Sequence, residues 1–122
     1  MATVRDLLAR KSGEVLSIAP SDTVLAAAQV MNQHAIGGLV VLDEGKLLGV
    51  FTERDILRRV VAAGRSPADT RVREGMTSPV ITCLPETSIE ECGAIMSGKR
   101  IRHLPVTDAR GLIGLVTSGD LL

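Results

Sequence analysis

The chain repeats itself, and this internal repeat constrains the fold more than any other feature of the sequence. Val15–Leu57 aligns without a gap with Val80–Leu122 when the sequence is shifted by 65 residues, the separation of Pro20 from Pro85. Identical pairs include Pro20 and Pro85, Met31 and Met96, Ile36 and Ile101, Asp43 and Asp108, Gly49 and Gly114, Thr52 and Thr117, and Asp55 and Asp120. Two copies of one motif predict two similar halves related by a pseudo-twofold axis, each with a version of the same site.

Each copy has the pattern of a strand, a helix, two strands and a second helix. In the first copy, Asp22 is the expected cap of the first helix. Its apolar face is Val24, Ala27, Ala28 and Met31. The predicted strands are Val15–Ile18, Leu39–Leu42 and Leu47–Phe51, and the second helix is Glu53–Ala63.

In the second copy, Thr87 is the expected cap and Glu90 completes a capping box. The matching face is Ile89, Cys92, Gly93 and Met96, and the strands are Leu104–Thr107 and Leu112–Val116.

The repeat predicts an α/β (α+β) fold in which two β-α-β-β-α motifs pack into one module. Residues 1–63 form the first motif, residues 64–71 a linker and residues 72–122 the second motif. Each motif starts with a short amphipathic lead-in, Val4–Ala9 or Val72–Met76. The two helix faces have small central residues that allow close approach, so these faces are the expected surface of a homodimer.

The composition argues against several classes of protein. Fourteen basic residues balance 14 acidic ones, which does not suit a dedicated nucleic-acid binder. One Phe and no Tyr or Trp leave little aromatic surface on which a base could stack. No apolar run reaches the ~20 residues that span a bilayer, and the first residues do not resemble a signal peptide, so no membrane association and a cytoplasmic location are expected.

The few cysteines and histidines do not form a recognisable site. Cys83 and Cys92 are expected to be buried free thiols because their spacing fits neither zinc nor redox motifs. His34 and His103 have no companion at ligand spacing, so no metal site is expected. No nucleophile elbow, paired catalytic base or phosphate-binding loop of the Walker type is found, and no enzymatic activity is expected.

The most specific local signal is Gly49–Asp55, which recurs as Gly114–Asp120. In both copies a strand ends, a threonine caps a helix and an aspartate follows three residues later. One interpretation is a helix cap alone, worth ~1 kcal/mol. The other is a nucleotide site, because the first turn of a helix attracts phosphate and a carboxylate can accept hydrogen bonds from a ribose diol. The recurrence of both residues in register favours the second interpretation.

These motifs resemble those of a tandem pair of cystathionine-β-synthase (CBS) domains, also called a Bateman module. The resemblance rests on the proline before each first helix, on His103-Leu104-Pro105-Val106 before Asp108, and on both Gly-to-Asp motifs. It implies binding of AMP, ADP or ATP, with NAD or an S-adenosyl ligand such as S-adenosylmethionine as alternatives. It also implies a non-catalytic regulatory sensor that needs no cofactor, forms homodimers and signals to an effector protein. The alternatives are a structural or protein-interaction pair without ligand, and an enzyme acting on a nucleotide.

The resemblance further implies two clefts, each completed by residues of the opposite copy. Cleft 1 comprises Thr52, Arg54, Asp55, Thr77, Ile81, Thr82, Ile101, Arg102 and His103. Cleft 2 comprises Leu16, Ser17, Ile36, Gly37, Gly38, Leu115, Thr117, Ser118 and Asp120. The arginines of cleft 1 suit phosphate, whereas the glycines of cleft 2 predict a roomier and less charged site. The basic run around Arg102 could instead be a solvated face.

Overall fold

The computed structural model describes residues 1–11 and 13–122, which fall into two compact units. The central unit is Leu16–Val80. The terminal unit combines Met1–Val15 with Ile81–Leu122. The mixed helix and strand content of both units agrees with the predicted α+β class.

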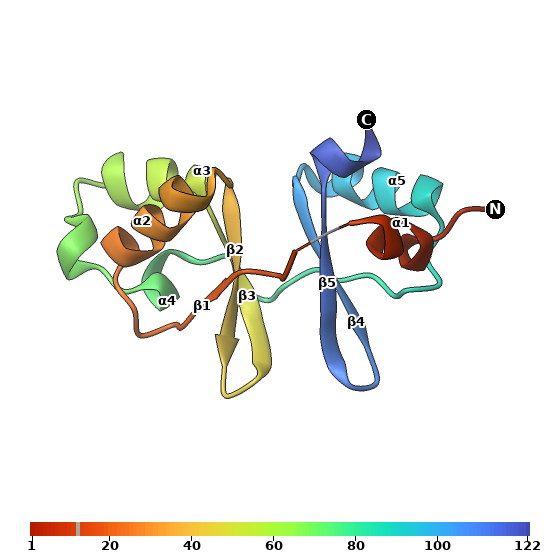
Figure 1. Ribbon diagram of the computed structural model, residues 1–122. Helices are drawn as coiled ribbons and strands as arrows, with labels where there is room; N and C mark the ends of the chain where they lie inside the picture. The colour runs from red at the N-terminus through yellow and green to blue at the C-terminus, as the bar shows by residue number, and fades with distance from the viewer. Residues whose placement is uncertain (12) are drawn as a thin grey trace. The chain divides into compact units, whose positions relative to one another are not determined.

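The central unit is built on a three-stranded sheet (Figure 1). Its strands are β1 (Ser17–Ile18), β2 (Gly38–Asp43) and β3 (Lys46–Thr52). β1 is parallel to β2, and β2 pairs with β3 as an antiparallel hairpin in which Gly38 lies opposite Thr52. The helices of the unit are α2 (Val24–His34), α3 (Glu53–Asp55), the π-helix η1 (Ile56–Val61), the short 3₁₀ turn η2 (Pro67–Asp69) and α4 (Val72–Gly75).

The terminal unit repeats this plan with a shorter sheet. The hairpin of β4 (His103–Asp108) and β5 (Gly111–Thr117) places His103 opposite Thr117, the same relation as Gly38 and Thr52. The counterpart of β1 is reduced to one parallel bridge between Cys83 and Val106. The helices of the unit are α1 (Val4–Arg10), α5 (Ile89–Lys99) and the 3₁₀ turn η3 (Ser118–Leu121).

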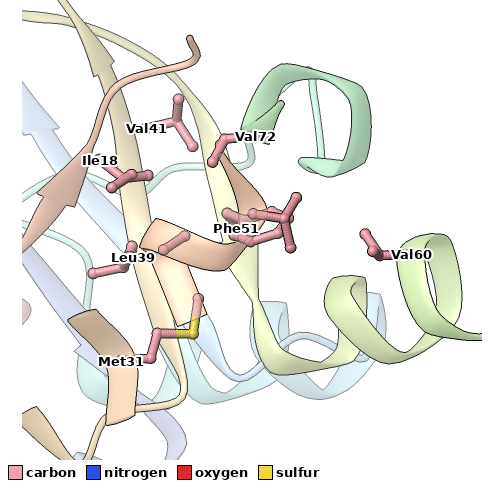
Figure 2. Packing of buried hydrophobic residues seen from close by; sticks show 9 residues of the cluster. Ile18, Met31, Leu39, Val41, Phe51, Val60 and Val72 are labelled. Carbon is pink, nitrogen blue, oxygen red and sulfur yellow. The ribbon is translucent and has the colours of Figure 1, made fainter. Parts of the chain in front are cut away.

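The helix faces predicted from the apolar spacing are buried within their own units. In the central unit Met31 of α2 packs with sheet residues such as Leu39 and Phe51 (Figure 2), and Ala27 of α2 belongs to the same cluster. In the terminal unit Cys92 and Met96 of α5 occupy the equivalent cluster with Leu104 and Val116. Burial of such side chains contributes about 1.5–3 kcal/mol each. The expectation that these faces form a dimer surface is therefore wrong, because the faces are used to fill the cores.

Each lead-in helix packs with the other copy of the repeat. In the terminal unit, the Val4 and Arg5 amides donate to the carbonyls of Thr87 and Pro85, at 2.8 and 2.9 Å. In the central unit, the Val72 and Arg73 amides make the same two bonds, to Asp22 and Pro20, at 2.8 and 3.0 Å. The first lead-in thus belongs to the unit of the second repeat, and the second lead-in to the unit of the first repeat. The sequence alone had placed each lead-in with the repeat that follows it, in motifs of residues 1–63 and 72–122.

Both predicted helix caps are wrong by one residue. Thr23 caps α2 by accepting from the Ala26 amide at 3.0 Å, and Ser88 caps α5 by accepting from the Glu91 amide at 3.0 Å. Asp22 instead accepts from the Ala19 amide at 3.1 Å, and Thr87 from the Leu84 amide at 3.1 Å. These side chains close the turn that precedes each helix, which leaves the next hydroxyl to act as the cap.

Candidate functional site

In the central unit, β3 runs into α3 at Thr52, and the side chains of Thr52 and Asp55 cap each other's backbone. The Thr52 amide donates to Asp55 Oδ2 at 2.9 Å, and the Asp55 amide donates to Thr52 Oγ1 at 3.3 Å. The Thr52 hydroxyl also donates to Asp55 Oδ2 at 3.2 Å. This reciprocal capping satisfies two amides of the first helical turn and holds the Asp55 carboxylate at the end of the strand.

The other oxygen of Asp55 is bonded to residues outside the motif. Thr77 Oγ1 donates to Asp55 Oδ1 at 3.2 Å, and Arg59 Nε lies 3.8 Å from the same oxygen. Arg59 also donates from Nη1 to the Met76 carbonyl at 2.9 Å. The side chain of Asp55 is only 8% exposed. Both oxygens of this buried carboxylate are therefore already engaged within the unit.

The glycine of the motif allows a second chain segment to approach β3. Val50 and Thr77 form an antiparallel bridge, with bonds of 3.2 and 2.9 Å between their backbones. A Cβ at Gly49 would lie 2.5 Å from the Thr77 carbonyl oxygen. Since the obstacle is backbone, only glycine permits this approach, which brings Thr77 to Asp55.

In the terminal unit, Asp120 receives bonds from two donors at the end of β5. The Thr117 amide donates to Asp120 Oδ2 at 2.8 Å, the counterpart of the Thr52 bond. Lys11 Nζ donates to the same oxygen at 2.8 Å and to the Leu115 carbonyl at 2.7 Å. The side chains of Asp120 and Lys11 are 21% and 33% exposed. This carboxylate is thus more accessible than that of Asp55 and carries an ion pair in place of the Thr77 hydroxyl.

The surroundings of Asp120 set its pKa by opposing effects. Partial burial disfavours the charged form, but the hydrogen bonds from Lys11 and from the Thr117 amide outweigh it and lower the pKa below its ordinary value of 3.8. Asp120 is accordingly a carboxylate at neutral pH. It can accept hydrogen bonds, and it faces a cation that belongs to the same chain.

The predicted site residues divide between the units. The central unit holds Leu16, Ser17, Ile36, Gly37, Gly38, Thr52, Arg54, Asp55 and Thr77. The terminal unit holds Ile81, Thr82, Ile101, Arg102, His103, Leu115, Thr117, Ser118 and Asp120. Each predicted cleft draws on both units, so the assembly of clefts 1 and 2 stays a prediction.

Within each unit, the structure brings the segment before the hairpin to the start of the motif helix, although the sequence assigned these two segments to different clefts. The Glu53 amide donates to the Gly37 carbonyl at 3.0 Å, and the Ser118 amide donates to the Arg102 carbonyl at 3.0 Å. Gly37 and Arg102 are equivalent in the repeat, so the segment before each hairpin lies beside the threonine-aspartate motif of its own unit. A Cβ at Gly37 would lie 3.0 Å from Glu53 Oε1, which leaves little room for a larger residue there.

Two functional candidates were missed by the sequence analysis. Arg59 could have been found, because it lies four residues after Asp55 on the predicted helix. Nothing in the sequence indicated Lys11 as a site residue. When Val4 is aligned with Val72, the position of Lys11 corresponds to Pro79, which is not basic. Lys11 adds a cation beside Asp120, where the repeat alignment had predicted a less charged site.

Other site types find no support in the part of the chain that the structure describes. Among residues 1–11 and 13–122, no three His, Cys, Asp or Glu side chains cluster as a metal site would require. Within the same residues, no helix has the length and apolar character to cross a membrane. Phe51 is fully buried, so the single aromatic side chain is not a stacking surface. Cys83 and Cys92 are buried free thiols, as predicted.

Comparison with known proteins identifies the repeat. The CBS domain family matches residues 3–62 and again residues 71–122. The mitochondrial CBS domain-containing protein CBSX3 of Arabidopsis thaliana is 39% identical over 98% of this chain, which spans 63% of that protein's length. CBS domain-containing protein YhcV of Bacillus subtilis is 36% identical, over 99% of this chain and 84% of the relative.

Solved structures show the same fold. A putative signal-transduction protein with CBS domains from Burkholderia ambifaria is 41% identical and superimposes with a TM-score of 0.95. The match covers 98% of this chain and 90% of the Burkholderia chain. A CBS domain pair solved with 5′-methylthioadenosine and S-adenosyl-L-methionine is 30% identical, with a TM-score of 0.86. This match covers 98% of this chain and 92% of the solved chain. The chain therefore belongs to the CBS domain family and carries a tandem pair of these domains.

Proposed function

We propose that this CBS pair binds an adenine nucleotide, with AMP, ADP or ATP as the first candidates and NAD or S-adenosylmethionine as alternatives. The observation that carries the proposal is the recurrence of one arrangement in both units: a threonine amide at the end of a strand donates to an aspartate three residues later, at 2.9 Å from Thr52 and 2.8 Å from Thr117. The solved relative with two adenosyl ligands supports this ligand class.

The proposed mechanism is regulatory and non-catalytic. A ligand held by both domains favours the arrangement of the pair that binds it more tightly, by no more than its differential affinity. The bound state is then recognised by an effector protein in the cytoplasm. Turnover of AMP, ATP, NAD or S-adenosylmethionine by the purified chain would contradict this mechanism.

A homodimer is part of the proposal, but on a different surface from the one the sequence indicated. Leu57 and Val61 of η1 are 61% and 57% exposed, and Leu25 of α2 is 42% exposed. Exposed apolar side chains four residues apart on a helix suit an interface between copies. Sedimentation of the wild type and of Leu57→Glu tests this, since the charged variant is expected to shift the mass toward the monomer.

One observation favours a structural role as the second candidate. Both oxygens of Asp55 are bonded within the central unit, and Asp120 is already paired with Lys11. Carboxylates used in this way could simply hold the strand ends and lead-ins together. A protein of this kind would bind no nucleotide.

Ligand detection separates the two candidates. The chain has no Trp or Tyr and is nearly transparent at 280 nm, so a co-purified nucleotide is visible as a band near 260 nm. Mass spectrometry of the denatured supernatant would identify it. For nucleotide-free protein, thermal shifts and calorimetric titrations with AMP, ATP, NAD and S-adenosylmethionine follow. Binding of any of these supports the proposal, and no binding to millimolar concentration supports the structural role.

A further inference from the structure

We propose that Lys11 is the residue that selects the ligand at Asp120, and that it favours ligands carrying a sugar diol together with a phosphate over neutral nucleosides. The proposal rests on the proposed function and adds a ligand preference to it. Lys11, Leu115, Thr117 and Asp120 all belong to the terminal unit.

The Lys11 ammonium occupies an oxygen that a ribose diol would use. Its Nζ lies 2.8 Å from Asp120 Oδ2, which also accepts from the Thr117 amide at 2.8 Å. Two donors already share this oxygen, so a diol that binds both oxygens of the carboxylate competes with Lys11 for Oδ2. The Lys11 side chain is 33% exposed and has a flexible stem, so its ammonium can move aside. The Thr117 donor is a backbone amide of β5 and stays in place.

Displacement of the ammonium has an energetic consequence that depends on the ligand. A neutral nucleoside takes the Asp120 oxygen and leaves Lys11 without its charged partner. A ligand that also carries a phosphate offers the ammonium a new anion, and charge-assisted hydrogen bonds of this kind are stronger than neutral ones. Lys11 also donates to the Leu115 carbonyl, 2.7 Å away, which keeps the ammonium near β5 when a ligand takes its place at Asp120.

The site around Asp55 lacks this selector. Its corresponding partner is the neutral hydroxyl of Thr77, at 3.2 Å, and the ion pair with Arg59 is longer at 3.8 Å. The two lead-ins contact the motif glycines with equivalent residues. A Cβ at Gly114 would meet Leu8, and a Cβ at Gly49 would approach Met76, which aligns with Leu8. This register leaves Lys11 with proline as its counterpart, so the cation beside Asp120 comes from the lead-in side, whereas the cation beside Asp55 is Arg59 of the adjoining π-helix.

The test compares AMP with adenosine as probes on the full chain. Amide resonances of Thr117 and Asp120, followed by NMR during titration, give dissociation constants for this site alone. We expect AMP to bind wild-type protein about tenfold more tightly than adenosine. In Lys11→Met the ratio should fall to about threefold or less, because adenosine no longer competes with the ammonium and AMP loses its cation. Lys11→Arg should retain the preference, and Lys46→Met is the control for loss of an exposed lysine in the central unit.

The possible outcomes separate this inference from the proposed function. An unchanged ratio in Lys11→Met overturns the role of Lys11, as does AMP binding that leaves the Thr117 and Asp120 resonances in place, although nucleotide binding itself would stand. Absence of binding to the wild type by either probe or by ATP overturns both. Lys11→Gln, which is neutral but polar, repeats the test if Lys11→Met does not melt cooperatively.

Discussion

Thr77 Oγ1 donates a hydrogen bond of 3.2 Å to Asp55 Oδ1, although the two residues are 22 positions apart. The bond connects the residue that follows the lead-in of the second repeat to the motif of the first. It forms because Thr77 pairs with Val50 beside Gly49 on the edge of β3. The motif aspartate is therefore both a helix cap and the point at which the exchanged lead-in is attached.

Removal of the Thr77 hydroxyl should weaken this attachment. Thr77→Val removes a hydrogen bond from Oδ1 of a largely buried carboxylate, and the ion pair of the same oxygen with Arg59 is longer at 3.8 Å. We expect the free energy of unfolding to fall by about 1.5–3 kcal/mol, as is typical of a hydrogen bond to a charged group. Urea unfolding measures the loss. Thr82→Val, at an exposed threonine of the terminal unit, is the control, and an equal loss in both variants would contradict the explanation.

The two motif glycines should respond differently to alanine. Gly49→Ala places a methyl group 2.5 Å from the backbone oxygen of Thr77, so β3 and the lead-in must separate. We expect a loss of about 1–3 kcal/mol in the free energy of unfolding. Gly114→Ala meets Leu8 methyl groups at 2.7 Å, and a leucine side chain can turn away at a smaller cost.

Gly98→Ala provides the control for these variants, because a Cβ there meets nothing within 4 Å. Gly98 lies within α5, where alanine is favoured over glycine by up to about 1 kcal/mol. Thermal melting should therefore rank Gly98→Ala as the most stable of the three and Gly49→Ala as the least. The reverse order of Gly49→Ala and Gly114→Ala would show that the approach of Thr77 is not restrictive.

The ion pair of Lys11 and Asp120 should contribute to stability only above acidic pH. The folded state lowers the pKa of Asp120 below 3.8, so the folded protein binds its proton less readily than the unfolded chain does. The contribution is present above the unfolded value and is lost as pH falls through the lower folded value. Asp120→Asn should therefore cost about 1 kcal/mol at pH 7 and progressively less below pH 4. Unfolding measured at both pH values tests this, and a pH-independent difference would contradict it.

The two cysteines should be unreactive in the folded protein. Burial, with a smaller effect from the neighbouring Cys92, raises the pKa of Cys83 to about 12, and burial likewise raises that of Cys92. Only the thiolate is nucleophilic, and its population at pH 8 is then about 10⁻⁴ for Cys83. Maleimide labelling followed by mass spectrometry should proceed only in denaturant. Rapid labelling of native protein at pH 8 would contradict the buried position of these side chains.

Much of the local structure was predictable because it depends on neighbouring residues. The hairpins formed where the turn composition indicated, and Ala27, Met31, Cys92 and Met96 are buried as the apolar spacing predicted. The caps at Asp22 and Thr87 were wrong because two adjacent side chains in each copy could accept the same type of bond. The predicted helix from Glu53 continues beyond α3 as a π-helix, a choice that local propensity does not distinguish.

The site was predicted in part for the same reason. The bonds within Thr52–Asp55 and Thr117–Asp120 span three residues and follow from the motif itself. The partners Thr77 and Lys11 follow the lead-ins and lie 22 and 109 positions away from their aspartates. The family resemblance indicated Thr77, but nothing in the repeat indicated Lys11.

The sequence alone determined that the chain contains two copies of one strand-and-helix motif, each ending in a threonine and an aspartate that cap one another. Those features are encoded by hydrophobic spacing and by hydrogen bonds between near neighbours. Only the tertiary structure decided that the lead-ins are exchanged and that Asp55 faces a hydroxyl while Asp120 faces an ammonium. Contacts of this kind depend on how remote segments pack around each core, and the one-dimensional repeat does not specify that packing.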